Sequence, residues 1–203
     1  MRQRHVAVKY RLLVVLLGLF SSALFLGGSS LFSQSGVVQP SVQVQKGAYL
    51  VTISGCSDCH SPKVFTEKGP EPDPTRLLAG HPAESPLPEI DFDRISPTGW
   101  VLMSNDLTAA VGPWGITYAA NLTSDEETGI GRWTEAAFIA TMRSGLHWGV
   151  GPAVLPPMPW QNLGQASDED LKAIFAYLKS THPVHNAVPA PMSLDELKAS
   201  LKK

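Results

Sequence analysis

Cysteine is scarce in this 203-residue chain, which contains only Cys56 and Cys59. Because the two are three positions apart, a disulfide between them would close a very short loop and stabilise the fold little. The pair therefore needs another explanation than a structural disulfide. Internal repeats are also lacking, as is the alternation of apolar and polar residues that half-buried strands show.

Acidic residues are missing from the N-terminal quarter, where none precedes Asp58. The first eleven residues include four Lys and Arg, and an apolar run broken only by two serines follows at residues 12–28. This layout is typical of an export signal. No A-x-A cleavage site follows, so residues 1–29 are interpreted either as a signal peptide or as an N-terminal membrane anchor formed by residues 12–28. In both cases we expect the remainder outside the cytoplasm, in the periplasm.

Negative charge dominates once this segment is set aside. Residues 30–203 hold 12 Lys and Arg against 18 Asp and Glu, a difference of about six charges. This balance disfavours nucleic acid and anionic membrane surfaces as partners.

Three segments have the apolar spacing and the end signals of helices: Gln45 to His60, Thr134 to Gly145 and Ser167 to Ser180. Thr134 and Ser167 are residue types that cap a helix N-terminus, and Gly145 is suited to end one. Pro62 stops the first helix, and Pro183 follows the last one.

Long loops are predicted between these helices. Residues 61–130 hold nine prolines and six glycines without a sustained period, and we expect at most a short helical piece at residues 101–107. The predicted fold class is all-α, with three main helices and long loops rich in proline and glycine. The predicted organisation is an export segment (1–29), a linker (30–43), one domain (44–188) and a C-terminal tail (189–203) with a short helix outside the core.

The sequence Cys56-Ser-Asp-Cys59-His60 is a C-x-x-C-H motif, the signature of c-type haem attachment. Residues three apart on a helical turn share a face, so both thiols can reach the two vinyl groups on one haem edge. His60 then presents its imidazole to the iron. A zinc site needs about four ligands, and a thioredoxin-like redox pair is expected near a βαβ pattern, which is absent. The motif predicts one covalent haem c with His60 as an axial ligand.

Met158 is the predicted second axial ligand. It stands in Leu155-Pro-Pro-Met-Pro-Trp160, where the prolines restrict the loop and Trp160 can pack against the haem. The other methionines after the motif are interpreted as core or tail residues: Met103, Met142 and Met192. Four histidines remain alternative ligands for a bis-His haem: His81, His147, His182 and His185.

With these residues assembled, the chain resembles class I c-type cytochromes and, among them, the cytochrome subunits of exported bacterial dehydrogenases. Four stretches within residues 45–188 carry the resemblance: Gly47–Pro62, Asn121–Thr134, Leu155–Trp160 and Asp168–Leu178. The resemblance implies a cytochrome c-like fold in which the first and last helices cross beside one haem.

The resemblance also implies site residues: Cys56 and Cys59 as thioether sites, and His60 and Met158 as iron ligands. Asn121, Trp133 and Arg143 are expected to line the haem or its propionates, with turn former, core aromatic and solvated charge as their alternative roles. Many such relatives string two or three haem modules together, whereas this chain has one motif and would pass single electrons.

Electron transfer is therefore the leading functional hypothesis, with a dehydrogenase or a terminal oxidase or reductase as the redox partner. The chain itself is then a carrier, not an enzyme, although it can be a subunit of an oxidoreductase. The alternative from another class is a haem enzyme or ligand sensor with an open or bis-His sixth position. A third interpretation is a structural zinc or disulfide module.

Overall fold

The computed structural model describes residues 40–202. The segment interpreted as a signal or anchor lies outside these described residues, as does most of the predicted linker. Among residues 40–202, no helix is both long enough and apolar enough to cross a bilayer.

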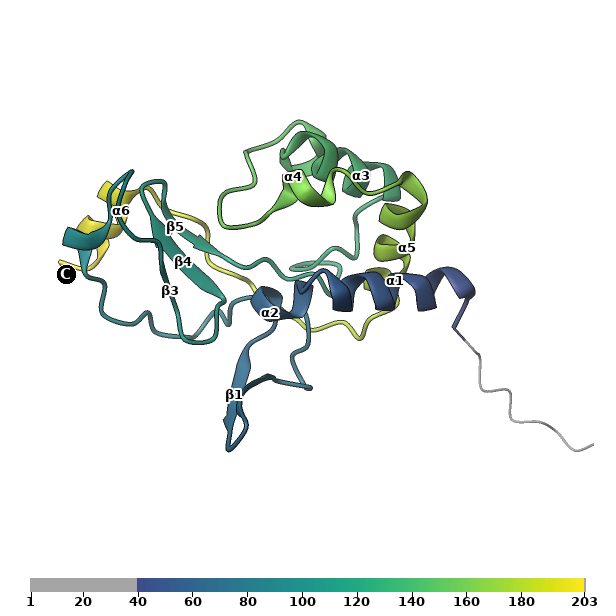
Figure 1. Ribbon diagram of the computed structural model, residues 1–203, viewed down its shortest axis with the longest axis horizontal. Helices are drawn as coiled ribbons and strands as arrows, with labels where there is room; N and C mark the ends of the chain where they lie inside the picture. The colour runs from purple at the N-terminus through teal and green to yellow at the C-terminus, as the bar shows by residue number, and fades with distance from the viewer. Residues whose placement is uncertain (1–39, 203) are drawn as a thin grey trace, which may run out of the picture. The chain divides into compact units, whose positions relative to one another are not determined.

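Three helices build the larger of two hydrophobic cores: α1 (Val42–Ile53), α3 (Glu135–Ser144) and α5 (Asp168–Lys179). The first and last of them pack against each other (Figure 1). They approach so closely at Gly47 that a Cβ there would overlap the carbonyl oxygen of Ala173. We call this the helical core; its buried residues are Val51, Leu78, Ile130, Phe138, Met142, Leu171, Ile174, Phe175 and Leu178.

The predicted helix ends are confirmed by the caps. The side chain of Thr134 accepts a hydrogen bond from the backbone N–H of Ala137, and Gly145 ends α3 in the left-handed conformation at φ 68°. Ser167 likewise accepts from the N–H of Asp170 at the start of α5. The first predicted helix is divided, because Gly55, with φ 66°, separates α1 from the short α2 (Cys56–His60).

The all-α prediction is wrong in part, because the long loop contains two antiparallel sheets. One is the hairpin of β1 (Lys63–Thr66) and β2 (Gly69–Pro72). The other has three strands in the order β3 (Leu102–Met103), β4 (Ala109–Gly112) and β5 (Gly115–Tyr118). The short helix predicted at residues 101–107 is therefore also wrong, since β3 lies there.

The strands gave no alternating signal for two physical reasons. Each is only two to four residues long, which is too short for a period of two to stand out. All four residues of β4 are buried, so both of its faces are apolar or small. Such a strand reads as a plain apolar run.

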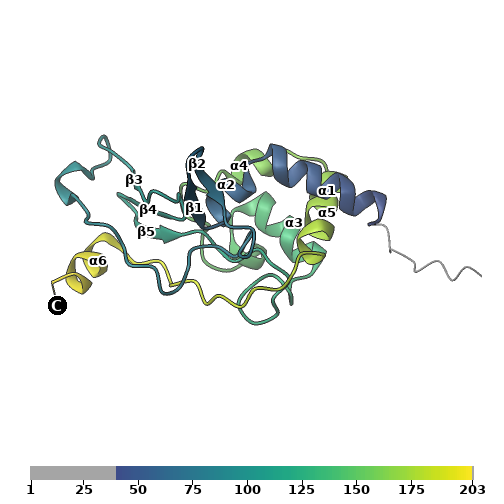
Figure 2. The same ribbon diagram turned by 90° about the horizontal axis from the view of Figure 1, so that it is seen from below.

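A second core forms between the three-stranded sheet and α6 (Leu194–Ser200), which lie side by side in both views (Figure 2). Its buried members are Ile95, Val111, Ile116 and Leu197. A capping box between Ser193 and Glu196 starts α6. The tail helix exists as predicted, but its expected place outside the core is wrong, because Leu197 is fully buried.

Two further features complete the chain. Short helices lie at η1 (Phe92–Arg94), η2 (His147–Gly149) and α4 (Trp160–Leu163).

Residues 181–192 connect α5 to α6 in an extended course, and we call them the C-terminal strap (Figure 1). The backbone of Met192, at its end, pairs with that of Ile116 in β5.

Candidate functional site

The two cysteines lie on the single helical turn of α2, and both are free, half-buried thiols. Gly55 can take the left-handed conformation that starts this turn because it has no Cβ. The ammonium of Lys63 closes the other end by donating to the carbonyls of Ser57, Asp58 and Ser61 at 3.2, 2.8 and 2.6 Å. The motif is therefore held as a rigid turn, as thioether attachment to one haem edge needs.

The electrostatics of the two thiols do not suit a redox pair. Burial raises the pKa of Cys56 to about 11, and burial also raises the pKa of Cys59. Reactive C-x-x-C pairs work in the opposite way, by lowering the pKa of the attacking thiol. Both residues are free, so the disulfide interpretation has no support here. Among residues 40–202 no three His, Cys, Asp or Glu side chains gather as a metal site, so the zinc interpretation lacks a ligand set there.

His60 is buried, with 9 % of its surface exposed, and its ring is held in one orientation. Its Nδ1 lies 2.7 Å from the carbonyl oxygen of Ala120. A carbonyl can only accept, so Nδ1 carries the proton and Nε2 has a free lone pair. Burial lowers the pKa of His60 and so favours the neutral ring. A neutral imidazole whose other nitrogen donates to a carbonyl is the usual form of a metal-bound histidine, and this residue fits haem iron.

The structure places Met158 half-buried at the edge of the helical core, which Cys56 also contacts. These two residues are 102 positions apart in the sequence, and both pack against the same buried cluster. Trp160 begins α4, and its ring packs on Gly145 at the end of α3, where a Cβ would overlap it. Trp160 thus attaches the Met158 loop to the end of α3.

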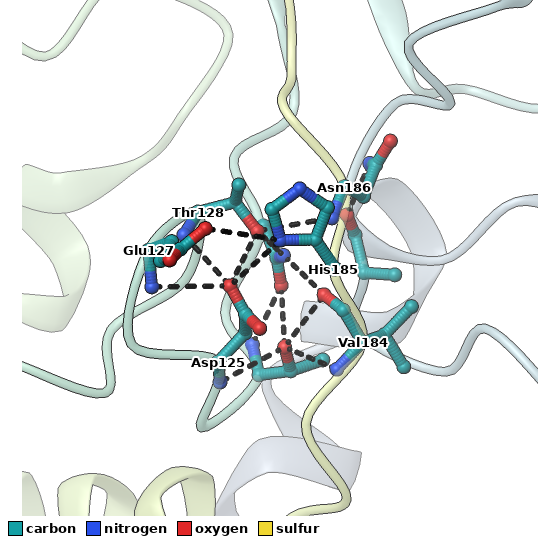
Figure 3. A network of polar contacts seen from close by, with 9 residues as sticks. Asp125, Glu127, Thr128, Val184, His185 and Asn186 are labelled. Atoms are coloured by element: carbon teal, nitrogen blue, oxygen red, sulfur yellow. Dashed lines mark hydrogen bonds and ion pairs between the residues drawn. The ribbon is translucent and has the colours of Figure 1, made fainter.

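The side chain of Asn121 bonds to the C-terminal strap. It joins the polar network that Thr128 and Val184 share (Figure 3). Its amide nitrogen donates to Thr128 Oγ1 and to the carbonyl of Val184, at 3.0 and 2.8 Å. Its amide oxygen accepts from the N–H and the hydroxyl of Thr123. Both protons of the amide and both lone pairs of its oxygen are engaged. These are the bonds of a turn former, and the expected place of Asn121 beside the haem stays a prediction.

Arg143 and Trp133 also have protein partners. The guanidinium of Arg143 pairs with Asp168 at 2.6 Å and also bonds the carbonyl of Gly164. These two contacts join the end of α3 to the start of α5. The ring of Trp133 borders the helical core and packs against Trp148, with centroids 5.1 Å apart. Their expected places beside the haem stay predictions.

The alternative histidine ligands are dispersed. The ring of His81 is buried, stacks on Tyr118 and contacts the hydroxyl of Thr108 through Nδ1 at 2.7 Å. His147 packs edge-on against Trp133, while His182 and His185 lie exposed on the C-terminal strap. Their roles as alternative iron ligands stay predictions.

Sequence reasoning missed the backbone cradle of His60. Its members are Ala120, the loop of residues 78–81 and Asn186 of the C-terminal strap. Ala120 acts through its carbonyl, which every residue type has, so no side-chain pattern could have indicated it. The one available signal was Gly80, whose φ of 78° and close packing on Ala120 leave no room for a Cβ.

Comparison with known proteins finds relatives among cytochrome subunits of dehydrogenases. The chain is 28% identical over 157 residues to the gluconate 2-dehydrogenase cytochrome c subunit of Pantoea cypripedii, a match covering 74% of this chain and 27% of that protein. It is 29% identical over 162 residues to the cytochrome c subunit of a quinone alcohol dehydrogenase from Gluconacetobacter polyoxogenes, covering 78% and 26%.

A shorter match, 33% identical over 70 residues, joins 34% of the chain to 14% of the fructose dehydrogenase cytochrome subunit of Gluconobacter japonicus. No protein-family model matches the chain. The chain spans about a quarter or less of the length of these relatives. The likeness supports the class of dehydrogenase cytochrome subunits, while the number of haems and the partner are not part of what the matches show.

Proposed function

We propose that this protein is a single-haem electron carrier on the outer side of the cytoplasmic membrane, serving a dehydrogenase as its cytochrome component. Cys56 and Cys59 attach the haem, His60 is the proximal ligand and Met158 the distal one. The observation that carries the proposal is the buried, neutral ring of His60, whose Nδ1–H is bound by Ala120 beside two free thiols on one turn.

The protein's own residues position the haem ligands and shield them from water. Bound haem iron supplies the one-electron chemistry by cycling between its ferrous and ferric states. The chain fixes the tautomer of His60, stiffens the loop of Met158 with three prolines and packs Cys56 of the attachment turn against the helical core. No proton has to move at a side chain for such transfer. A thioether ligand raises the reduction potential relative to most alternatives.

The redox partner and the location also belong to this proposal. The relatives are cytochrome subunits of dehydrogenases, which supports a dehydrogenase as the electron donor. The basic and apolar N-terminal sequence supports export, and its residues 12–28 supply either a cleaved signal or a tether. Electron-transfer encounters typically use small, weak interfaces, so a transient contact is sufficient.

Haem staining of a denaturing gel, together with absorption spectra, tests the proposal. We expect the wild-type chain to retain stain, because only covalent haem remains on a denatured chain, and Cys56→Ala/Cys59→Ala to lose it completely. In the ferric wild type we expect a methionine-to-iron charge-transfer band that Met158→Ala abolishes. Met103→Ala is the matched control, because Met103 lies in the edge strand β3, and it should keep the band.

Three outcomes would contradict the proposal. Absence of stain in the wild type would leave a module without haem. High-spin ferric iron in the wild type would indicate an open sixth position and favour a haem enzyme or a ligand sensor. A low-spin spectrum unaffected by Met158→Ala would favour a bis-His haem.

A further inference from the structure

The C-terminal strap reaches the proximal side of the site through Asn186. Its side-chain nitrogen donates to the carbonyls of Ala79 and His81, at 2.7 and 2.8 Å. Its side-chain oxygen accepts from the N–H of Ala83 at 3.0 Å. One amide thus holds three backbone groups of a loop that lies more than 100 positions earlier in the chain.

The loop that Asn186 holds contacts both the backbone of His60 and the segment that carries Ala120. Gly80 stands between the two clamped carbonyls, and its N–H donates to the carbonyl of His60 at 2.8 Å. On its other side Gly80 packs against the peptide of Ala120, so closely that a Cβ would overlap it. The next N–H, that of His81, donates to the carbonyl of Ala119 at 2.9 Å. The loop therefore fixes the distance between His60 and the segment that carries Ala120.

The strap also holds that segment directly. The carbonyl of Val184 accepts from Asn121, the residue after Ala120, and the backbone N–H of Asn186 donates to Thr128 at 2.9 Å (Figure 3). Residues 184–186 therefore bind both the loop of residues 78–81 and the segment that follows Ala120. Asn186 bonds to both of them, through its side chain on one side and its backbone on the other.

We infer that Asn186 is a positioning residue that sets the strength of the hydrogen bond from His60 Nδ1 to Ala120, and through it the reduction potential of the iron. A carbonyl that binds the Nδ1 proton makes the imidazole a stronger electron donor, which favours the ferric state. Loosening the clamp weakens this bond and raises the potential. The inference rests on the proposed haem attachment, because it concerns the ligand of that haem.

The test compares Asn186→Ala with the wild-type holoprotein in two measurements. The first is the midpoint potential by redox titration, which we expect to rise in the variant. The second is the exchange rate of the His60 Nδ1 proton in the reduced protein by NMR, which we expect to increase roughly tenfold as the bond opens more often. The amide hydrogen bonds of Asn186 also contribute stability, so a lower Tm is expected as well.

Two controls separate positioning from loss of stability. Asn105→Ala makes the same chemical change in an exposed turn and should alter neither measurement. Leu197→Ala destabilises the second core without touching the cradle, so it should lower Tm while potential and exchange stay at wild-type values. If Asn186→Ala does not fold, Asn186→Ser keeps one donor in place of two and should give smaller changes in the same directions.

The inference is overturned if Asn186→Ala, or the serine variant in its place, lowers Tm but leaves both the potential and the exchange rate unchanged. Asn186 would then have only a structural role. That result is distinct from failure of the proposed function, because it requires a wild-type protein with attached, low-spin haem. A wild type without such haem would refute the proposed function before this test begins.

Discussion

The helical core and the second core are built by different means and carry different residues. The helical core is formed by α1, α3 and α5, and it contacts three predicted site residues, Cys56, Trp133 and Met158. The second core joins a three-stranded sheet to α6, and none of the predicted site residues in the described chain contacts it. The helices, whose apolar spacing is regular in the sequence, therefore lie beside the attachment site. The long loop without such spacing contributes to a separate apolar cluster.

The C-terminal strap connects the helical core to the second core. It leaves α5, passes the cradle of His60 at residues 184–186 and then supplies Met192 and α6 to the second core. Docking of the tail on the sheet therefore anchors a segment that also borders the axial ligand. The second core holds the far end of the strap, whereas the part of the strap near His60 is held by its own hydrogen bonds at residues 184–186.

Truncating one fully buried leucine in each core should have the largest effect and separate the two regions. Leu171→Ala and Leu197→Ala should each lower the free energy of unfolding by about 2–5 kcal/mol, because each leaves a cavity. Leu171→Ala should also weaken Met158 ligation, whereas Leu197→Ala should leave the haem spectrum unchanged. Denaturant unfolding followed by haem absorbance and by tryptophan fluorescence measures both. Equal spectral changes in the two variants would show that the cores are not separable.

Filling one close approach in each region should have the next largest effect. Gly47→Ala would press on the carbonyl of Ala173 where α1 crosses α5, and Gly115→Ala on the carbonyl of Met192 where the tail meets β5. We expect each to cost about 1–3 kcal/mol in unfolding free energy from overpacking. Measurement is by chemical denaturation of the holoprotein.

Matched controls isolate the overlap from other effects of these substitutions. Gly69→Ala has nearly the same strained φ as Gly115, 111° against 107°, but its Cβ would enter open space. It should therefore cost less than Gly115→Ala. Gln43→Ala, at an exposed position of α1, should leave stability near the wild type. A Gly115→Ala variant no less stable than Gly69→Ala would argue against a tight tail contact.

Lowering the pH should have a smaller effect on stability, through the carboxylate of Asp73. Hydrogen bonds from Thr75 and Arg76 lower the pKa of Asp73 to about 2. Because the folded pKa lies below the unfolded value of about 3.9, this carboxylate stabilises the fold above pH 4 and its contribution is lost as the pH falls from about 4 to 2. Asp73→Asn should therefore show a smaller drop in Tm between pH 5 and pH 3 than the wild type, measured by thermal melting. An identical drop would exclude this role.

The helices were predictable because their signals are local. Thr134, Gly145 and Ser167 each act on backbone groups within four residues, so the caps could be read from the chain and are confirmed. The sheets were not predictable in the same way, since β4 is buried on both faces and pairs over a few residues only. The place of α6 depends on Leu197 meeting Ile116, about 80 positions away.

At the candidate site, the roles of side chains could be predicted from the sequence, whereas the backbone contacts could not. The C-x-x-C-H motif identifies Cys56, Cys59 and His60 because attachment chemistry requires those side chains at that spacing. Met158 follows from its proline-rich loop and remains a prediction. The expected place of Asn121 near the haem also remains a prediction. The structure shows that its amide binds Thr128, Thr123 and the strap.

By itself the sequence determined the three main helices, the attachment turn and an apolar N-terminal segment, because each depends on residues close together in the chain. Tertiary structure alone decided which carbonyl binds His60, which loop presses on that carbonyl and which residue clamps the loop. These contacts join Ala120, Gly80 and Asn186 through backbone groups that all residues share. Such groups are identical in every sequence, so only the folded chain can show which of them meet.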